Sequence, residues 1–346
     1  MVSIGTMGSL QPTLLKLSRR EDLTRDEART AFELIMSGQA SEAQIGGLLV
    51  GMASKGTTAE ELVGAASVMR EKVIPVSCDN QAAVILDTCG TGGDVKGTFN
   101  ISTAAAIIAA SCGVKVVKHG NRSASSKSGS ADVLEAMGVK LEVGPEVLGR
   151  CLAQANICFA FARSHHPAMK HVATARTSLG IPTIFNLLGP LTNPGRARHQ
   201  LLGVFAPELT DRLAVVLRAL GSERAWVVHA QDGLDELSTL GPTRISELKG
   251  GHIETRTFDP ASVGIAYARL SDLVVNSVEE AADALQRVIA GEPGPKRDIA
   301  ALNAAAALVV AGRVNDLNEG MRMSIEALEN GNAQATLQTL VKQSQG

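Results

Sequence analysis

The residues best placed for chemistry form a glycine-rich turn with the sequence DTCGTGGD, at positions 87–94. Glycine tolerates positive φ angles and lets backbone N–H groups approach an anion closely. A helix that begins near Asn100 would add the positive end of its dipole and its free N–H groups. The turn therefore predicts a phosphate cradle, and the alternative interpretation is a tight turn that binds nothing.

Two common phosphate-binding motifs do not fit this turn. No Gly-Lys-Ser/Thr ends it, and the third glycine of the dinucleotide fingerprint is absent. Asp94 also argues against a simple anion site, because a carboxylate repels phosphate unless a sugar hydroxyl or a metal ion lies beside it. A ribose phosphate would satisfy both the glycines and the aspartate.

A second polar loop has the sequence KHGNRSASSKSGS, at positions 118–130. Its three cations and five serine hydroxyls could surround a phosphate group. Loops at the carboxyl ends of neighbouring parallel strands converge at one edge of the sheet, where ligands bind. We therefore expect both loops to face one ligand, although a serine-rich loop by itself could simply be solvated.

The elements that must position these loops change character along the chain. Capping-box patterns at Thr24 and Thr58 start helices, and strand signals are absent from the first 75 residues. Short apolar runs then alternate with helical stretches, which predicts a mostly parallel sheet covered by helices on both faces. The expected strands are at 84–87, 115–117, 157–161, 201–205 and 225–229. From about Ser277 the chain is expected to be mostly helical.

Composition limits the function classes. The 346 residues carry a net charge of −2 and 3% aromatic residues, so neither a basic nucleic-acid surface nor a set of base-stacking platforms is expected. Five cysteines without a CxxC pair indicate reduced thiols rather than a disulfide framework or a zinc site. The N-terminus lacks a signal-peptide pattern and no membrane span is expected, so we predict a cytoplasmic protein.

The combined motifs resemble those of the anthranilate phosphoribosyltransferases. The resemblance starts with CGTGGD at 89–94, TFNIST at 98–103 and KHGNR at 118–122, in this order and spacing. It continues through HPAMK at 166–170, TIFN at 183–186, LGPLTNP at 188–194, DGLDE at 232–236 and NAAA at 303–306. Related loops occur in pyrimidine nucleoside phosphorylases, which share the fold.

The resemblance implies an α/β fold class, with a small all-helical N-terminal domain plus a larger domain whose mostly parallel central sheet is flanked by helices. The small domain would comprise 1–78, with about 166–195 returning to it, and the large domain 79–165 and 196–346. A hinge near Asp79 would join them.

The resemblance also implies a site for phosphoribosyl pyrophosphate (PRPP), one for anthranilate and one for two Mg²⁺ ions. The PRPP contacts would be Gly90, Gly93, Asp94, Thr98, Asn100, Ile101, Ser102, Thr103, Lys118, His119, Gly120, Asn121, Arg122, Ser123, Ala124, Ser125, Ser126 and Ser130. The anthranilate contacts would be Gly90, His119, Asn121 and Arg176, and the metal ligands Ser102, Asp235 and Glu236. No residue is expected to act as a strong general base.

Charge complementarity makes two of these assignments reasonable. Arg176 offers a planar, permanently charged donor for a carboxylate substrate, whereas a lone helical arginine could equally form a surface ion pair. Asp235 and Glu236 could bind a polyanion only through a cation such as Mg²⁺. The alternative for such an acidic dipeptide is an exposed turn.

Two departures from the family pattern surround Arg176. Pro182 stands where the family has an arginine, and Ala173-Thr174-Ala175 replaces its usual Ala-Pro-Val. Proline fixes φ, removes an N–H and cannot pair with a carboxylate. These changes are expected to alter how this segment packs and how tightly the acceptor binds.

The expected function is therefore transfer of the phosphoribosyl group of PRPP to the amine of anthranilate, a pentosyl transfer in tryptophan biosynthesis, by a homodimer. Two alternatives remain at this point: an enzyme like the pyrimidine nucleoside phosphorylases, and a relative that binds nucleic acid without catalysis. The intact loops and the slightly negative net charge argue against the second alternative.

Overall fold

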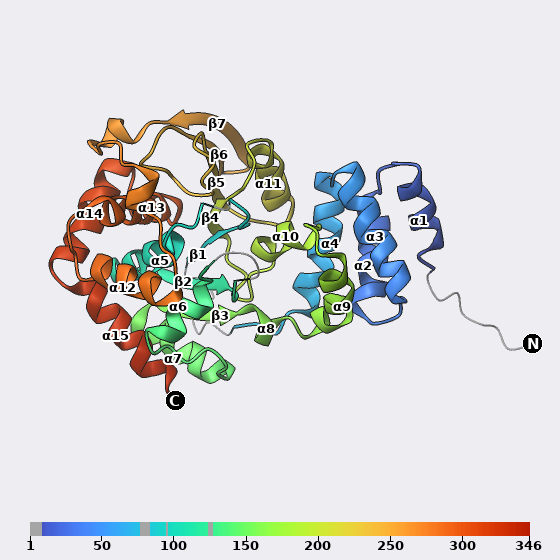
Figure 1. Ribbon diagram of the computed structural model, residues 1–346, viewed down its shortest axis with the longest axis horizontal. Helices are drawn as coiled ribbons and strands as arrows, with labels where there is room; N and C mark the ends of the chain where they lie inside the picture. Colours follow the sequence, from blue (N-terminus) through green and yellow to red (C-terminus); the bar gives the residue numbers. More distant parts are fainter. Residues whose placement is uncertain (1–8, 77–83, 95, 124–126) are drawn as a thin grey trace, which may run out of the picture. The chain divides into compact units, whose positions relative to one another are not determined.

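The computed structural model describes residues 9–76, 84–94, 96–123 and 127–346. They divide into two compact units, drawn in Figure 1. The helical unit comprises the chain up to position 74 together with 166–192, and the α/β unit comprises 75–165 and 193–346. The sequence suggested boundaries at 78, 166 and 195, and the hinge expected near Asp79 lies outside the described residues.

The helices of the helical unit start where capping side chains are available. Thr24, Ser41 and Thr58 each accept a hydrogen bond from a backbone N–H three residues further on, in complete capping boxes. The helices are α1 (Gln11–Ser18), α2 (Arg25–Met36), α3 (Glu42–Lys55), α4 (Ala59–Lys72), α9 (Lys170–Leu179) and α10 (Phe185–Leu188). Short 3₁₀ turns cover Pro167–Met169 and Gly189–Leu191.

The returning segment is part of the core of the helical unit. Phe185 of α10 packs against Phe32 of α2, with ring centroids 5.7 Å apart. The side chain of Arg70, on α4, donates a 2.6 Å hydrogen bond to the carbonyl of Leu191. Segments more than a hundred residues apart in the sequence therefore fold as one unit.

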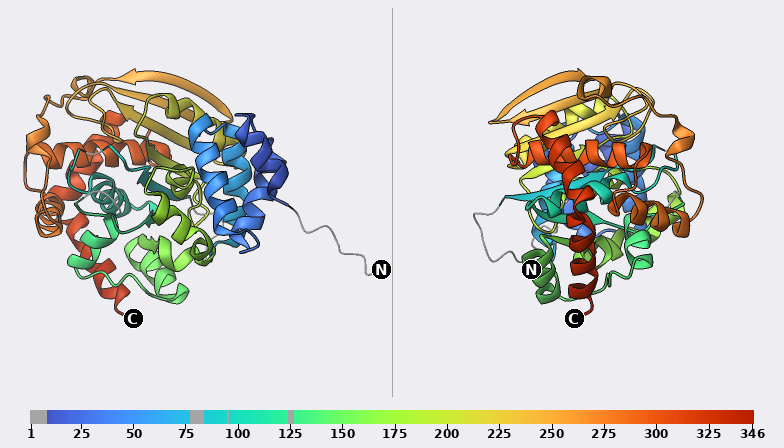
Figure 2. Two further views of the ribbon diagram at one scale, coloured as in Figure 1. Left: turned by 45° about the vertical axis from the view of Figure 1, so that its right-hand side comes forward. Right: turned by 90° about the vertical axis from the view of Figure 1, so that its left-hand side faces the viewer.

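In the described part of the α/β unit, seven strands form one sheet with the order β3-β2-β1-β4-β5-β6-β7 (Figures 1 and 2). The strands are β1 (Ile85–Gly90), β2 (Lys115–Gly120), β3 (Ile157–Phe161), β4 (His199–Gly203), β5 (Arg224–Ala230), β6 (Thr243–Lys249) and β7 (His252–Phe258). The pairs from β3 to β5 are all parallel, as predicted.

The sequence analysis did not foresee the antiparallel edge formed by β6 and β7. These strands are joined by Gly250 and Gly251, whose φ angles are 57° and 80°. A two-residue hairpin turn of type I′ needs positive φ at both positions, so the Gly-Gly pair was the signal for this hairpin.

Helices cover both faces of the sheet (Figure 1). They are α5 (Ile101–Ser111), α6 (Ser130–Ala136), α7 (Pro145–Ala155), α8 (Ala162–His165), α11 (Glu208–Ala219), α12 (Val278–Ile289), α13 (Pro295–Val310), α14 (Leu317–Glu329) and α15 (Asn332–Ser344). Short 3₁₀ turns cover Pro260–Val263 and Leu270–Asp272. Crossovers between parallel strands are right-handed. The chain moves toward one edge of the sheet from β1 to β3 and toward the other edge from β4 to β5. Helices α5 and α7 therefore lie on the opposite face from α11.

The face with α5 carries an alanine-rich core built around α13. Helix α13 packs against α5 and α14, and it is buried from Ile299 to Val310. Gly320 of α14 touches the backbone of Ala305 so closely that a side chain there would collide with it. Small residues thus let these helices approach each other closely.

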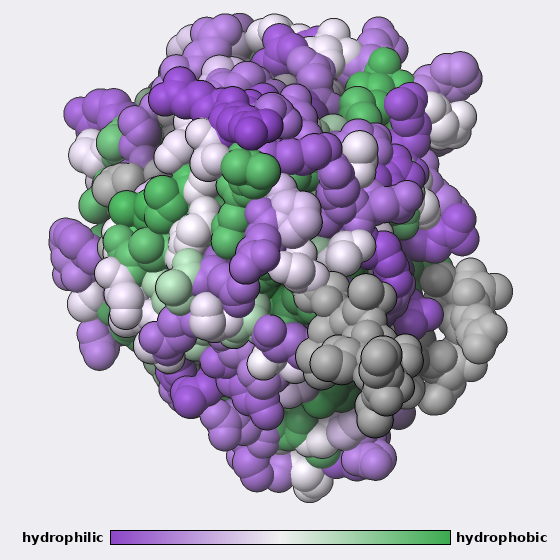
Figure 3. Space-filling model, turned by 90° about the vertical axis from the view of Figure 1, so that its right-hand side faces the viewer, coloured by the Kyte–Doolittle hydropathy of each residue, from purple (hydrophilic) through white to green (hydrophobic). Residues whose placement is uncertain are grey.

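The surface of the described chain is mixed in polarity. On the face drawn in Figure 3, hydrophilic residues predominate and hydrophobic residues gather in patches between them. None of the helices in the described part of the chain combines the length and the apolar character that crossing a bilayer requires.

Candidate active site

The carboxyl ends of β1 and β4 lie beside each other in the sheet. From β1 the chain continues to β2 on one side, and from β4 it continues to β5 on the other side. The carboxyl ends of β1 and β4 therefore mark the topological switch point of the sheet. Their last residues, Gly90 and Gly203, are paired in register. Ligands of open α/β sheets bind outside the carboxyl ends of the strands at such a point.

Asp235 lies directly against both glycines. A Cβ atom at Gly90 would collide with its carboxylate, and one at Gly203 would collide with its backbone carbonyl. The N–H of Gly92 also donates a 3.1 Å hydrogen bond to Asp235 Oδ2. The glycine-rich turn and the acidic pair, 143 positions apart, therefore meet at the switch point.

Three carboxylates crowd together there. Burial and the charge of Asp94 raise the pKa of Asp235 to about 7. Burial raises the pKa of Glu236 as well, with the charge of Asp235 as the second cause. Each shift reports that an added negative charge is unfavourable in this cluster, so the cluster is suited to hold a cation.

Lys118 supplies positive charge from inside the sheet. Its side chain is buried, and its ammonium donates to the carbonyl of Thr88 at 2.6 Å and to Ser102 Oγ at 3.2 Å. Burial lowers the pKa of Lys118, while the charges of Asp87 and Glu236 oppose that shift. The ammonium thus ties β1, β2 and the start of α5 together behind the predicted metal ligands.

The start of α5 is already oriented toward the acidic pair. The backbone N–H of Ser102 lies on the side of the Glu236 carboxylate and favours its charged form, against the larger effect of burial on its pKa. Thr88 Oγ1 donates to the carbonyl of Ser102 at 2.9 Å. The positive end of this helix therefore faces the carboxylate of Glu236.

Two backbone donors of the glycine-rich turn remain open. Among the described residues, no hydrogen bond occupies the N–H of Gly93 or of Asp94. Gly93 is exposed and has a φ of 91°, a conformation that glycine adopts readily. An anion at this turn would find two free N–H groups beside the acidic cluster.

The second loop meets the start of α5. Asn100 Nδ2 donates to the carbonyl of Ser128, and Ser128 Oγ donates to Asn100 Oδ1, both at 3.4 Å. Ser130 Oγ lies 3.4 Å from the carbonyl of Asn121. The two loops therefore converge, as the parallel strands predicted, while Ala124, Ser125 and Ser126 lie outside the described residues.

Arg122 differs from its expected role as an open phosphate donor. Its guanidinium pairs with Glu135 at 2.7 Å and with Asp132 at 3.0 Å, and these partners raise its pKa. Asp132 also accepts the N–H of Ser123 at 3.1 Å. A phosphate could use Arg122 only in competition with these exposed ion pairs, which are individually weak.

The other predicted contacts are buried, closely packed or held by backbone hydrogen bonds. Ile101 and Thr103 are buried, and Thr98 forms a β-bridge with Val274. Gly120 packs so closely against Ser130 and Phe159 that no side chain fits. The backbone N–H of His119 donates to Asp87, and its side chain is buried.

Arg176 belongs to the helical unit, on α9. It is half-buried, and its guanidinium lies 5.0 Å from the ring centroid of Phe185. Within the described residues it has no hydrogen-bonded or ionic side-chain partner, and burial lowers its pKa. Arg25 and Arg29 of the same unit pair with Glu60 and Glu71. A surface ion pair therefore does not explain Arg176.

Pro182 causes no visible loss in the turn before α10. The N–H that is used there belongs to Thr183, which donates to Asn186 Oδ1 at 3.0 Å. Proline at 182 is thus compatible with the start of this helix.

Sequence reasoning missed two residues of the site. Asp87 is buried and accepts the N–H of His119 at 3.2 Å, and burial raises its pKa although Lys118 lies nearby. Gly203 leaves room for Asp235. A charged residue in a buried strand was the signal for the first, whereas a glycine ending a strand is too common to indicate the second.

The residues present fit a magnesium ion that is completed by its substrate. Among the described residues, no group of three or more His, Cys, Asp or Glu side chains is arranged to hold a metal ion by itself. Magnesium binds oxygen ligands, keeps waters and bridges substrate phosphates, so it does not need a complete protein cage. The carboxylates of Asp94, Asp235 and Glu236 supply oxygens whose mutual repulsion a cation would relieve.

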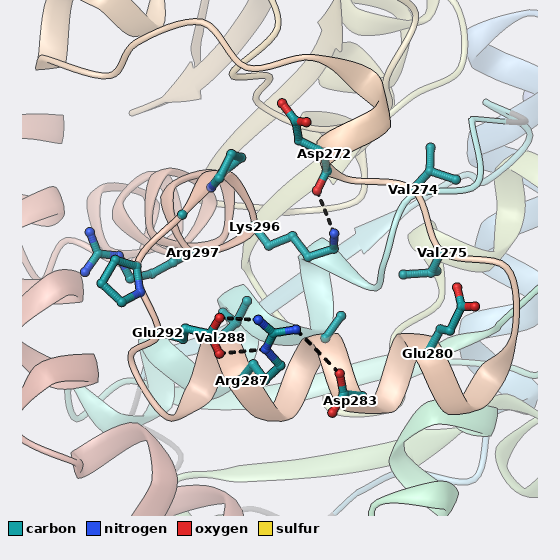
Figure 4. Close-up of a pocket in the computed structure, with 14 residues that line it drawn as sticks. Asp272, Val274, Val275, Glu280, Asp283, Arg287, Val288, Glu292, Lys296 and Arg297 are labelled. Atoms are coloured by element: carbon teal, nitrogen blue, oxygen red, sulfur yellow. Dashed lines mark hydrogen bonds and ion pairs between the residues drawn. The ribbon is translucent and has the colours of Figure 1, made fainter.

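A separate cavity of about 330 Å³ lies beside α12 and the start of α13 (Figure 4). Its charged groups are largely paired with protein atoms: Arg287 with Glu292 and Asp283, and Lys296 with the carbonyl of Asp272. None of the predicted site residues lines this cavity. It is therefore not the candidate active site.

The raised pKa of Asp235 predicts a pH-dependent stability of the metal-free protein. A carboxyl group whose folded pKa exceeds its unfolded value favours the folded state at low pH, and this contribution is lost as pH rises from about 4 through 7. Asp235→Asn removes the ionisation, so we expect the variant to melt on the order of 2 °C or more above the parent at pH 8 without Mg²⁺.

Thermal melts at pH 5 and pH 8 in the presence of a chelator would test this. The exposed Asp283→Asn is the matched control, because it also removes one carboxylate. An equal loss of stability between the two pH values in the parent and in Asp235→Asn would refute the interpretation.

Comparisons with known proteins agree with the fold. The helical bundle domain of a glycosyl transferase family matches residues 11–73, and the a/b domain of that family matches residues 82–334. The anthranilate phosphoribosyltransferases of Methylobacterium nodulans and Rhizobium meliloti are 50% and 49% identical to this chain. In both cases the match covers 97% of this chain and 98% of the relative.

Solved structures give the same result. The anthranilate phosphoribosyltransferase of Thermus thermophilus has a TM-score of 0.90 and 42% identity, and the match covers 96% of this chain and 99% of that one. The Saccharomyces cerevisiae enzyme in complex with PRPP and Mg has a TM-score of 0.87 and 27% identity, over 97% and 98% of the two chains. By sequence over nearly its whole length and by fold, this chain belongs to the anthranilate phosphoribosyltransferase family.

Proposed function

We propose that this chain transfers the phosphoribosyl group of PRPP to the amine of anthranilate, giving N-(5-phosphoribosyl)anthranilate and pyrophosphate in tryptophan biosynthesis. The observation that carries the proposal is the meeting of the glycine-rich turn, the start of α5 and the acidic pair at one switch point. Relatives of nearly equal length bear this activity in their names.

The phosphoribosyl donor would bind across the glycine-rich turn and the second loop. The open N–H groups of Gly93 and Asp94 suit phosphate oxygens, and the carboxylate of Asp94 suits a ribose hydroxyl. We carry over the other PRPP contacts from the resemblance, with Arg122 exchanging its carboxylate partners for phosphate. The yeast relative that was solved with PRPP and Mg supports this choice of donor.

Ser102, Asp235 and Glu236 would hold Mg²⁺, and we propose two ions. When bound, the metal neutralises pyrophosphate charge and polarises its oxygens. Lys118 holds Ser102 Oγ at 3.2 Å from its ammonium, which fixes the direction of the hydroxyl lone pairs. The Ser102 N–H favours the charged form of the Glu236 carboxylate that would meet the metal.

In the reaction, the bond between ribose C1 and the pyrophosphate oxygen breaks, a bond from C1 to the amine nitrogen forms with inversion, and the nitrogen then loses a proton to water or to the released pyrophosphate. The aromatic amine is already a neutral nucleophile, so no strong general base is needed. Positive charge develops on the ribose, and the nearby carboxylates are suited to stabilise it. Positioning and electrostatics would therefore supply most of the acceleration.

Arg176 would bind the carboxylate of anthranilate, together with Gly90, His119 and Asn121. A half-buried guanidinium without a protein anion is a suitable partner for an anionic ligand. The aromatic ring of Phe185 lies beneath this guanidinium. A yeast relative solved with 4-fluoroanthranilate supports an aromatic acid as the acceptor.

Fluorescence of anthranilate gives a direct test of the function. We expect it to fall when PRPP and Mg²⁺ are both present, and to stay constant when either is omitted. A pyrimidine nucleoside with phosphate serves as the competing substrate pair. Release of a free pyrimidine base with unchanged anthranilate fluorescence would favour the phosphorylase alternative, and a salt-dependent shift of nucleic acid without either reaction would favour a binding protein.

The metal role of the acidic pair predicts a separate result. Asp235→Asn combined with Glu236→Gln should lower turnover at limiting Mg²⁺ by about a hundredfold or more, since it removes preorganised charge at the reacting group. The melting temperature should change little by comparison. Asp283→Asn is the control, and unchanged turnover of the double variant at limiting Mg²⁺ would exclude the metal role.

Arg176→Gln should act on the acceptor alone. We expect the KM for anthranilate to rise by about tenfold or more, because a charge-assisted contact to the carboxylate is lost. The KM for PRPP should stay near the parent value. Arg25→Gln, which breaks an exposed ion pair on α2, is the control, and a PRPP effect as large as the anthranilate effect would contradict this assignment.

We also propose that the protein is a cytoplasmic homodimer. The resemblance implies the homodimer, and five cysteines without a CxxC pair indicate a reducing compartment. Sedimentation of the purified protein measures the oligomeric state.

A further inference from the structure

Helix α13 carries one buried polar residue in an apolar stretch. Its sequence from 299 to 310 is IAALNAAAALVV, and Asn303 is fully buried in the middle of it. A buried carboxamide without hydrogen bonds is strongly unfavourable, so its partners reveal why this position tolerates asparagine. The NAAA motif at 303–306 also has no assigned role in the ligand contacts described above.

Asn303 makes a two-way pairing with a single residue. Its Oδ1 accepts the N–H of Leu237 at 3.0 Å, and its Nδ2 donates to the carbonyl of Leu237 at 2.9 Å. The second Nδ2 hydrogen is directed to the carbonyl of Ile299 at 2.9 Å, one turn earlier in α13. The carboxamide thus pairs with Leu237 as a neighbouring strand would, and its orientation is fixed by its own helix.

Leu237 follows the acidic pair directly. The segment between β5 and β6 contains no helix or strand, so the sheet ladder does not hold Asp235 and Glu236 in place. Gly90 and Gly203 limit the approach of Asp235 from the sheet side. The pairing with Asn303 fixes the other end of the acidic pair from the helix side.

Repulsion makes this anchor necessary. The carboxylate of Asp235 lies against Gly90 and accepts the N–H of Gly92 at 3.1 Å, with the carboxylate of Glu236 next to it in the chain, and neighbouring like charges separate unless the backbone is restrained. We propose that Asn303 is a positioning residue for the metal-bearing turn: through the backbone of Leu237 it holds Asp235 and Glu236 where a divalent cation and its sugar pyrophosphate bind. This inference rests on the metal role of the acidic pair under the proposed function.

A purely structural role is the competing explanation, and it predicts a different result. If Asn303 only satisfied buried backbone groups, its loss would lower the melting temperature without affecting Mg²⁺. A positioning role also weakens the metal, because partners that orient metal ligands typically affect affinity by about 10–100-fold.

Asn303→Asp and Asn303→Ala test the proposal. The aspartate keeps the shape and the acceptor for the Leu237 N–H but places an oxygen against the Leu237 carbonyl, whereas the alanine removes both bonds. Leu308→Ala is the matched control, because Leu308 is equally buried on α13 and no hydrogen bond joins its side chain to the turn. Calorimetric titration with PRPP in the presence of Mg²⁺ measures binding without turnover, and the Mg²⁺ concentration for half-maximal activity gives a second value.

We expect both Asn303 variants to weaken Mg²⁺-dependent PRPP binding by about tenfold or more and to regain turnover at high Mg²⁺. Leu308→Ala should leave both values unchanged at a similar loss of melting temperature. Equal effects in all three variants, unchanged Mg²⁺ dependence in the Asn303 variants, or failure of both Asn303 variants to fold would overturn the proposal. The double variant at Asp235 and Glu236 separates the metal role of the acidic pair from the positioning role of Asn303. If the double variant alone changes the Mg²⁺ concentration needed for half-maximal activity, only the role of Asn303 is wrong.

Discussion

Crowded negative charge at the switch point of the sheet is the constraint on which the site depends. Asp94, Asp235 and Glu236 lie close enough to raise the pKa values of the last two, and the buried ammonium of Lys118 offsets only part of that charge. Such a cluster is unfavourable in the free protein and becomes favourable with a cation present. The surrounding fold can be understood as the set of contacts that keeps these carboxylates together.

Close backbone approach provides the first of those contacts. Gly90 and Gly203 face each other in the sheet, and only residues without a side chain leave space for Asp235. The second contact is the pairing of Asn303 with Leu237. The turn is therefore restrained from both ends, whereas its charged side chains remain half-buried and able to meet a ligand.

The sequence predicted those parts of the site that depend on local chemistry. Periodicity and the glycine-rich turn indicated the parallel strands and the meeting of the two loops, because parallel strand ends necessarily share an edge. The β6–β7 hairpin was not predicted, although Gly250 and Gly251 suit its tight turn, because β7 is mostly exposed and lacks the apolar run of a buried strand. The ion pairs of Arg122 and the close contact of Gly203 depend on residues far apart in the sequence, so no local pattern could predict them.

The buried position of Lys118 bears on how a phosphate ligand could bind. A lysine in a phosphate loop suggests a direct charge contact, but this ammonium is buried and points to the Thr88 carbonyl and to Ser102 Oγ. Among the described residues of the glycine-rich turn, the N–H groups of Gly93 and Asp94 are open donors instead. Under the proposed function, the polyanion would bring cations to the carboxylates while its oxygens meet these N–H groups. Binding of the donor and binding of the metal would then be coupled, because the cation offsets the charge of both the carboxylates and the phosphates.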